Sequence, residues 1–249
     1  AIRTSGAGAG WANTDIAVTV GCEVGGAALP DVSFTVAASG GTHTLDVDQG
    51  AECAVSTVGD AGQSRARFAS STDTTWVDTP VTVQVGAGLT GLSVDLVFDA
   101  APLAVSSTNT GAGARFANVA TAATVSDCTF NGAAVDVEGQ ASATLPLAVA
   151  GGTATVPMVV GASCRVEQST SGGAAEVRFT TANGTTDATG ATVAVADVDG
   201  AQVAIENVFE VAALSVTQVV TGDAAWAANM DTRVDVTCTF NGTPLQHIG

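Results

Sequence analysis

The sequence predicts an all-β protein built from tandem sandwich modules of about 110 residues, of the immunoglobulin-like or prealbumin-like kind. Three observations support this. Short apolar–polar alternations bounded by Gly, Asn and Asp recur, whereas no stretch sustains a 3.6-residue apolar period. Whole segments repeat at a fixed spacing, and the cysteines recur with them. With eight Phe, three Trp and no Tyr, each core must be small and largely aliphatic.

The internal repeat is the strongest signal. Three segments begin at Gly6, Gly111 and Gly222, and each places an aromatic residue 11 or 12 positions before a cysteine. These pairs are Trp11 and Cys22, Phe116 and Cys128, and Trp226 and Cys238. Downstream, the run that starts at Gly40 aligns without a gap with the run that starts at Gly151, displaced by 111 residues. So many fixed offsets exclude a chance similarity.

The repeat sets the expected boundaries at 1–100, 101–211 and 212–249. We expect the first module to have a clipped first strand, because Ala1 aligns with Ser106. We expect the third to be truncated, so that the chain is a window onto a longer array. No Pro- or Gly-rich linker separates the modules, which favours a semi-rigid rod over a flexible chain of beads.

The cysteine-bearing strands alternate in a way that points each cysteine inward. In each of these strands, one face is expected to carry the cysteine together with apolar side chains. The sets are Ile16, Val18, Val20 and Val24 with Cys22, Val55 with Cys53, Val166 with Cys164, and Val234, Val236 and Phe240 with Cys238. Near the module ends, Leu92, Val94, Leu96 and Phe98 alternate and are matched by Val203, Ile205 and Phe209.

Two inward cysteines per module predict one buried disulfide each, Cys22–Cys53 and Cys128–Cys164. In the chain-entropy model a loop of this size contributes roughly 3.5 kcal/mol. Zinc binding is the competing interpretation, and the wide spacing without accompanying histidines disfavours it. Cys238 is expected to be unpaired by truncation, its partner lying past Gly249. Disulfides indicate an extracellular or cell-surface location.

Turn signals separate the strands, although they leave the strand order open. Asn131-Gly132 and Asn241-Gly242 follow the first cysteine strand of their modules and predict tight hairpins. Gly40-Gly41 and Gly151-Gly152 are expected to separate strands in the same way.

The charge excludes two classes of partner. The net charge is −17, there is no Lys, and all seven cations are Arg. Such a surface repels nucleic acid and anionic membranes, and it favours solubility. No run of 18 apolar residues is present, so we expect no membrane insertion, and no signal peptide stands at the start.

Several motifs resemble a known family. The run from Leu214 to Gly242, the elements GAECAV and GASCRV, and the closing VFD and VFE resemble a domain of unknown function that occurs in tandem in actinobacterial surface proteins. There it often accompanies collagen-adhesin-type and pilin-like domains. The resemblance implies a stalk or spacer module without activity. A Lys is usual in the opening strand, where this chain has Ser107 and Gln218, so no Lys–Asn isopeptide bond can form.

Candidate chemical sites are few. Gly86 to Gly91 matches G-x-G-x-x-G, but an alternating strand follows instead of a helix, so we expect a hairpin loop. Asp197, Asp199 and Gly200, with Glu206 downstream, suggest calcium at a module joint, but Ala201 and flanking strands disfavour an EF-hand. With His43 and His247 as the only histidines, no catalytic, cofactor or metal site is expected, and the protein is predicted not to be an enzyme.

The tryptophans are candidate contact residues. Trp11 and Trp226 occupy the repeated aromatic position, which favours packing in the core or at a joint over stacking on a sugar. Trp76 has no counterpart in the repeat and lies in a polar stretch, so it is the better candidate for an exposed contact.

Two functions remain. The first is a structural stalk of a secreted or wall-anchored, adhesin-like surface protein, whose partners are adjacent modules. The second is a module that binds an extracellular glycan or protein. The loops that follow Cys22 and Cys128 differ by five residues in length, which favours the stalk.

Overall fold

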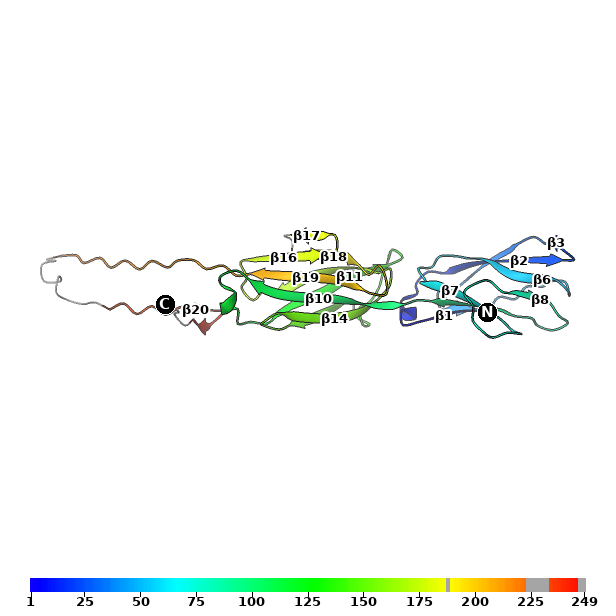
Figure 1. Cartoon of the computed structure of the whole chain (residues 1–249), viewed down its shortest axis with the longest axis horizontal. Coiled ribbons are helices and arrows are strands. Elements are labelled where there is room, and N and C mark those ends of the chain that lie inside the picture. Colours follow the sequence, from blue (N-terminus) through cyan, green and yellow to red (C-terminus); the bar gives the residue numbers. More distant parts are fainter. Residues whose placement is uncertain (187–188, 223–232, 246–249) are drawn as a thin grey trace.

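The computed structural model describes residues 1–186, 189–222 and 233–245. It shows two β-sandwiches end to end, followed by a segment with one short hairpin (Figure 1). The first sandwich contains β1–β9 and the second β10–β19, and the chain passes from β9 into β10 with only two residues between them. The all-β class and the sandwich architecture are therefore confirmed.

Two sheets form the first sandwich, with strand orders β5-β1-β9-β7 and β3-β2-β6-β8, and β4 pairs with the outside of β2. Its elements are β1 (Ile2–Ser5), the 3₁₀ turn η1 (Ala9–Trp11), β2 (Ile16–Val24), β3 (Ala27–Ala28), β4 (Val32–Val36), β5 (Gly40–Gly41), β6 (Glu52–Val58), β7 (Arg65–Ser70), β8 (Thr82–Gln84) and β9 (Leu92–Val97).

The second sandwich repeats this topology, with orders β14-β10-β19-β16-β17 and β12-β11-β15-β18, and β13 paired to β11. Its elements are β10 (Ala100–Thr110), η2 (Ala114–Phe116), β11 (Thr121–Phe130), β12 (Ala133–Ala134), β13 (Ser142–Leu147), β14 (Gly152–Val159), β15 (Ser163–Thr170), β16 (Glu176–Thr181), β17 (Gly184–Thr186), β18 (Gly190–Ala194) and β19 (Ala201–Val208). In both sandwiches the first strand pairs in parallel with the last.

The predicted inward faces of the cysteine strands are buried in both complete sandwiches, except at Val24, which is half-buried. Ile16, Val18 and Val20 are buried beside the half-buried Cys22, and Val166 is buried beside Cys164. A disulfide joins Cys22 to Cys53 across β2 and β6, with the two Cα atoms 4.1 Å apart. A second joins Cys128 to Cys164 across β11 and β15, at 4.0 Å. Each disulfide therefore links neighbouring strands of one sheet.

The Asn-Gly turns are hairpins, as predicted. Asn131 and Gly132 have φ angles of 51° and 75°, and Asn241 and Gly242 have 47° and 76°. A type I′ turn requires two successive residues with positive φ angles, and Asn-Gly adopts these angles with the least strain. These turns join β11 to β12 and β20 (Thr239–Phe240) to β21 (Thr243–Pro244).

Three other turn predictions are wrong. Gly40-Gly41 does not separate a hairpin pair, because the preceding strand β4 lies in one sheet and β5 pairs with β1 in the other. Gly151-Gly152 stands at the same crossing in the second sandwich, between β13, which pairs with β11, and β14, which pairs with β10. The loop from Gly86 to Gly91 likewise connects β8 and β9, which belong to different sheets. Glycine at these positions marks a crossing between sheets, which a local sequence signal cannot distinguish from a hairpin.

The third segment differs from the expectation for its inward face. Val234 and Val236, which alternate with Cys238, are exposed, and among the described residues of this segment only β20 and β21 form strands. Trp226 lies outside the described residues. Cys238 is exposed and forms no disulfide with any residue that the structure describes.

Candidate functional site: a repeated joint between modules

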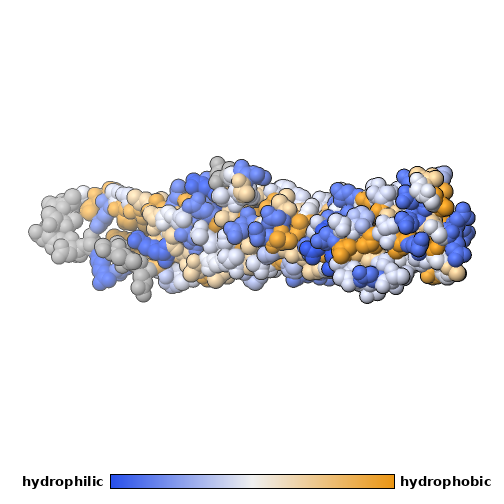
Figure 2. Space-filling view, turned by 45° about the vertical axis from the view of Figure 1, so that its right-hand side comes forward, coloured by the Kyte–Doolittle hydropathy of each residue, from blue (hydrophilic) through white to orange (hydrophobic). Residues whose placement is uncertain are grey.

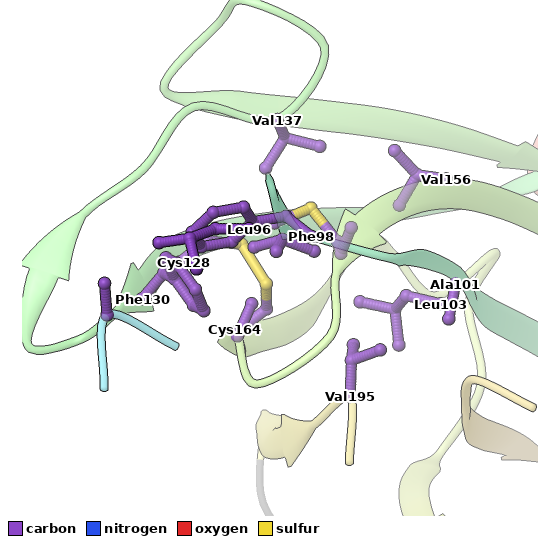
Figure 3. Close-up of a cluster of buried hydrophobic side chains, with 14 of the residues drawn as sticks. Leu96, Phe98, Ala101, Leu103, Cys128, Phe130, Val137, Val156, Cys164 and Val195 are labelled. Carbon is purple, nitrogen blue, oxygen red and sulfur yellow. A yellow bond between two sulfur atoms is a disulfide. The ribbon is translucent and has the colours of Figure 1, made fainter. Parts of the chain in front are cut away.

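The hairpin tip of β11–β12 inserts into the end of the first sandwich. Phe130 is only 2% exposed, and its ring meets Phe98 edge to face with centroids 6.3 Å apart. Figure 3 shows Phe130 and Phe98 beside Leu96 and the disulfide of Cys128, so one apolar cluster contains residues of both sandwiches. Edge-to-face pairs of buried aromatic rings stabilise beyond the area they bury. The apolar cores of the two sandwiches are therefore continuous through the joint.

Polar contacts fix the hairpin in one orientation. The side-chain amide of Asn13 donates to the carbonyl oxygen of Phe130 at 2.8 Å, and that of Asn131 donates to the carbonyl oxygen of Ala61 at 2.7 Å. The indole N–H of Trp11 donates to the carbonyl oxygen of Asp136 at 2.8 Å. Because the donors lie on both sandwiches, rotation of one against the other breaks several bonds at once. Trp11 therefore belongs to the joint, as the packing interpretation predicted.

Glycine makes room for the phenylalanine. Gly62 has φ +80°, and a Cβ there would lie 2.5 Å from Cζ of Phe130. Any side chain at position 62 would therefore clash with the inserted ring and strain the backbone. The hairpin and the loop that receives it are fitted to each other.

The same contacts recur at the next joint. Asn118 donates to the carbonyl oxygen of Phe240 at 2.9 Å, and Asn241 donates to that of Gly172 at 2.8 Å. Phe240 meets Phe209 edge to face at 6.2 Å. A Cβ on Gly173, which has φ +88°, would lie 2.8 Å from the ring of Phe240. The joint is thus a property of the repeat and not of one boundary.

The β2–β3 hairpin of the first sandwich lacks the phenylalanine and asparagine that insert at the two joints. Val24, Gly25 and Gly26 stand where the later modules have Phe-Asn-Gly. Gly25 and Gly26 keep positive φ angles of 58° and 82°, so the turn is retained, whereas the ring and the amide are absent.

A charged cluster stabilises the first sandwich. The carboxylate of Asp95 is fully buried, and its Oδ2 pairs with Arg67 of β7 and, at 3.2 Å, with Arg3 of β1. The guanidinium of Arg3 lies 4.4 Å from the ring centroid of Trp76, a cation–π distance. Trp76 is therefore half-buried beneath an arginine, which differs from the exposed contact that its polar neighbours predicted.

Burial by itself would raise the pKa of Asp95. The interactions of its carboxylate with Ser5, Arg67 and Arg3 outweigh this effect of burial, so the pKa of Asp95 lies below its usual value. A carboxyl whose folded-state pKa lies below its unfolded value, near 3.9, contributes full stability above about pH 4. That contribution is lost as the pH falls through the folded-state pKa.

We therefore expect Asp95→Asn to lower the stability of the first sandwich at pH 7 by about 1.5–3 kcal/mol, the range for hydrogen bonds to a charged group. The difference from the unsubstituted chain should shrink when urea unfolding is repeated at pH 3. Glu206→Gln is the matched control, because Glu206 occupies the same strand position but is 37% exposed beside Arg178. Equal losses of stability from Asp95→Asn and Glu206→Gln would contradict the inference that burial of Asp95 makes its ion pairs contribute more.

The remaining predicted candidates take structural roles. The Asp197 carboxylate accepts the backbone N–H of Asp199 at 3.0 Å, and Glu206 accepts the hydroxyl of Thr110 at 2.8 Å. His43 stacks on Phe34 with ring centroids 4.1 Å apart. Among the described residues, no three His, Cys, Asp or Glu side chains are grouped to hold a metal ion. The same part of the chain contains no helix long and apolar enough to cross a membrane.

The position at which the family resemblance implies a lysine is buried. Ser107 faces the core of the second sandwich, and its Oγ has no hydrogen-bond partner among the described residues. Asn207 of the neighbouring strand β19 is fully buried, and its amide donates to Asn109 at 3.4 Å.

Apart from Trp11, the residues of the joint were not predicted to link modules, although a signal exists. Thr-Phe-Asn-Gly occurs at 129–132 and 239–242, where the sequence predicted the turn and the inward face of Phe240 but no contact between modules. A large aromatic residue directly before a type I′ turn would be exposed at the tip of an isolated hairpin. Its repetition is the sign that something covers it.

Comparison with known proteins gives structural neighbours only. No protein-family model and no curated protein matches the chain. The major pilin from Streptococcus pyogenes matches with a TM-score of 0.42 and 14% identity, over 84% of this chain and 97% of that one. The C-terminal fragment of the pilus adhesin SpaC from Lactobacillus rhamnosus GG matches with a TM-score of 0.40 and 9% identity, over 86% and 98%. TM-scores below 0.5 are too low to carry a conclusion about this chain.

Proposed function

We propose that this chain is a length of stalk in a secreted or wall-anchored surface protein, where its modules hold a distal domain away from the cell. The observation that carries the proposal is the joint: the same aromatic pair and asparagine contacts occur at both module boundaries. A chain whose successive modules dock in one fixed way has a defined length and direction, which a stalk needs and a string of independent binding modules does not.

Two further features support a stalk outside the cell. Each complete sandwich has one disulfide, a bond that persists in oxidising compartments. The net charge of −17 opposes lateral association of parallel rods. Trp76, the candidate contact residue, is covered by Arg3 instead of standing free, which weakens the case for a binding module.

Asn131→Gly tests the rigidity of the joint. Glycine keeps the positive φ of the turn and removes the amide that bonds Ala61, and it is the residue that the first sandwich has at this place. We expect ¹⁵N relaxation to report one anisotropic tumbling tensor for both sandwiches in the unsubstituted chain. The variant should show faster, partly independent tumbling, because it loses about 0.5–1.5 kcal/mol of docking free energy.

Gly25→Asn is the control, since it places the same amide on a hairpin tip that contacts no other module in this structure. It should leave the tumbling unchanged. Independent tumbling of the sandwiches in the unsubstituted chain would refute the stalk. Saturable binding of a glycan on an array, abolished by substitution of Trp76, would favour the binding module instead.

A further inference from the structure

Three asparagines in this chain are followed by glycine: Asn131, Asn183 and Asn241. Spontaneous deamidation is fastest at such pairs, because glycine has no Cβ to hinder its backbone nitrogen from attacking the asparagine side chain. The structure places the three pairs in two different settings. Asn131 and Asn241 stand at the hairpin tips that form the joints, whereas Asn183 lies in the turn between β16 and β17.

The side-chain amide of Asn131 is held by the first sandwich. Its Nδ2 donates to the carbonyl oxygen of Ala61 at 2.7 Å, and it also lies 3.2 Å from Oγ1 of Thr14 and 3.4 Å from Oδ1 of Asn13. The surface of the first sandwich continues into that of the second across the joint (Figure 2). Asn131 is nevertheless exposed, so water reaches it. Hydrogen bonds from the neighbouring module, and not burial, therefore restrain this amide.

The pair at Asn183 belongs to the second sandwich alone. Asn183 and Gly184 are exposed, and they connect two paired strands of one sheet. The backbone N–H of Asn183 donates to the hydroxyl of Thr181 at 3.2 Å, a contact in which the side-chain amide takes no part. Neither joint contributes to the geometry of this turn. Asn183 is thus an internal reference for an Asn-Gly pair outside the joints.

Deamidation requires the asparagine side chain to rotate. The backbone nitrogen of Gly132 attacks Cγ of Asn131, the bond from Cγ to Nδ2 breaks, and ammonia leaves with the proton of the attacking nitrogen. Water then hydrolyses the cyclic succinimide at either carbonyl, which gives aspartate or isoaspartate. While Nδ2 donates to Ala61, the amide is fixed in its docked orientation. This bond has to break before Cγ turns toward Gly132, so the reaction starts from the open joint.

The products no longer fit the joint. An aspartate at position 131 has no N–H to donate, and its oxygens would face the carbonyl oxygen of Ala61 and Oδ1 of Asn13, which are both acceptors. An isoaspartate adds a carbon to the backbone at the tip, where the type I′ turn requires two successive positive φ angles. It would therefore also displace the adjoining Phe130. The amide is needed for docking, and docking protects the amide.

We propose that Asn131 is a deamidation site controlled by the joint: the docked joint protects its amide, and deamidation during a transient opening leaves the two sandwiches undocked. Opening is reversible and deamidation is not, so the reaction converts a fixed joint into a flexible one. The next joint repeats the arrangement, because Asn241 donates to the carbonyl oxygen of Gly172. The proposal depends on the geometry of the joint and holds whether the chain is a stalk or a binding module.

The protection is tested by incubating the full chain at mildly alkaline pH and following each site by peptide mapping with mass spectrometry. Asn183 should react at least about tenfold faster than Asn131, since about 1.4 kcal/mol of docking free energy reduces the open fraction tenfold. Gly62→Ala should speed the reaction at Asn131 and leave Asn183 unchanged. Its Cβ would lie 2.5 Å from Cζ of Phe130 and 2.7 Å from Oδ1 of Asn131. Gly173→Ala, the matched control, acts at the next joint and should leave Asn131 unchanged.

A second variant guards against misfolding of the Gly62→Ala chain. Asn13→Ala changes an exposed residue and removes the hydrogen bond to the carbonyl oxygen of Phe130, so it should also speed the reaction at Asn131. Equal rates at Asn131 and Asn183 in the unsubstituted chain would overturn the protection. A rate at Asn131 that neither Gly62→Ala nor Asn13→Ala raises would do the same.

The consequence is tested with Asn131→Asp, which reproduces one product and keeps a residue type that tolerates a positive φ. We expect ¹⁵N relaxation to show loss of common tumbling of the two sandwiches. Asn183→Asp adds the same charge outside the joints and should leave the tumbling unchanged. Chain that is aged until Asn131 has reacted should behave as Asn131→Asp does. Common tumbling that persists in the Asn131→Asp chain would refute the claim that deamidation opens the joint.

Discussion

Replacing Cys128 and Cys164 together by Ala should lower the free energy of unfolding of the second sandwich by about 3.5 kcal/mol, and that of the first by much less. The disulfide closes a loop of 36 residues between β11 and β15, so its loss returns conformational freedom mainly to the unfolded second sandwich. Against a total stability of about 5–15 kcal/mol, the loss is large enough to unfold a marginal module at elevated temperature.

Hydrogen exchange measures this loss separately in each sandwich, through the amides of β11 and β15 and those of β2 and β6. The matched variant is Cys22→Ala with Cys53→Ala, whose loop of 31 residues is similar in size. It should produce the mirror image, with the larger loss in the first sandwich. Equal loss of protection in both sandwiches from either pair of substitutions would show that they do not unfold separately.

Phe130→Ala should cost about 3–5 kcal/mol, the range for truncating a buried phenylalanine. Its effect should extend to the first sandwich, because Phe98 loses the ring against which it packs. We expect lower protection of the end of β9, together with loss of common tumbling by ¹⁵N relaxation. Few single substitutions in this chain should change both stability and overall shape.

Val24→Ala is the control for Phe130→Ala, since Val24 occupies the same hairpin position in the first sandwich but is only half-buried. It should cost much less and leave the joint unchanged. If Phe130→Ala reduced stability without altering the relative motion of the sandwiches, the ring would be a core residue of the second sandwich only. The joint would then depend on the hydrogen bonds made by Trp11, Asn13 and Asn131.

The joint also gives the modules a sequence requirement. At both joints the following module has Phe-Asn at its hairpin tip, and the preceding module has an Asn (Asn13 or Asn118) and a Gly (Gly62 or Gly173) that contact it. The first sandwich has the receiving residues but, with Val24 and Gly25, not the inserting ones. The downstream end of the first sandwich can therefore receive a hairpin with Phe-Asn at its tip, whereas its own β2–β3 hairpin does not present these two residues.

The sequence by itself determined the fold class, the repeat and the inward faces of the cysteine strands. It also determined the Asn-Gly hairpins. These properties depend on neighbours along the chain or on equality between distant segments, so alternation, turn chemistry and self-alignment are enough to find them. Ile16, Val18 and Val20 are buried because a strand with one apolar face can bury it in only one register.

Only the tertiary structure decided the rest. Pairing of β1 with β9 and the crossing between sheets at Gly40 join residues far apart in sequence, and nothing local selects one partner over another. The burial of Phe130 and the cover of Trp76 by Arg3 depend on which surfaces meet. Each arises between segments 70 or more residues apart or between modules, where side-chain packing and hydrogen-bond geometry, and not local propensity, set the outcome.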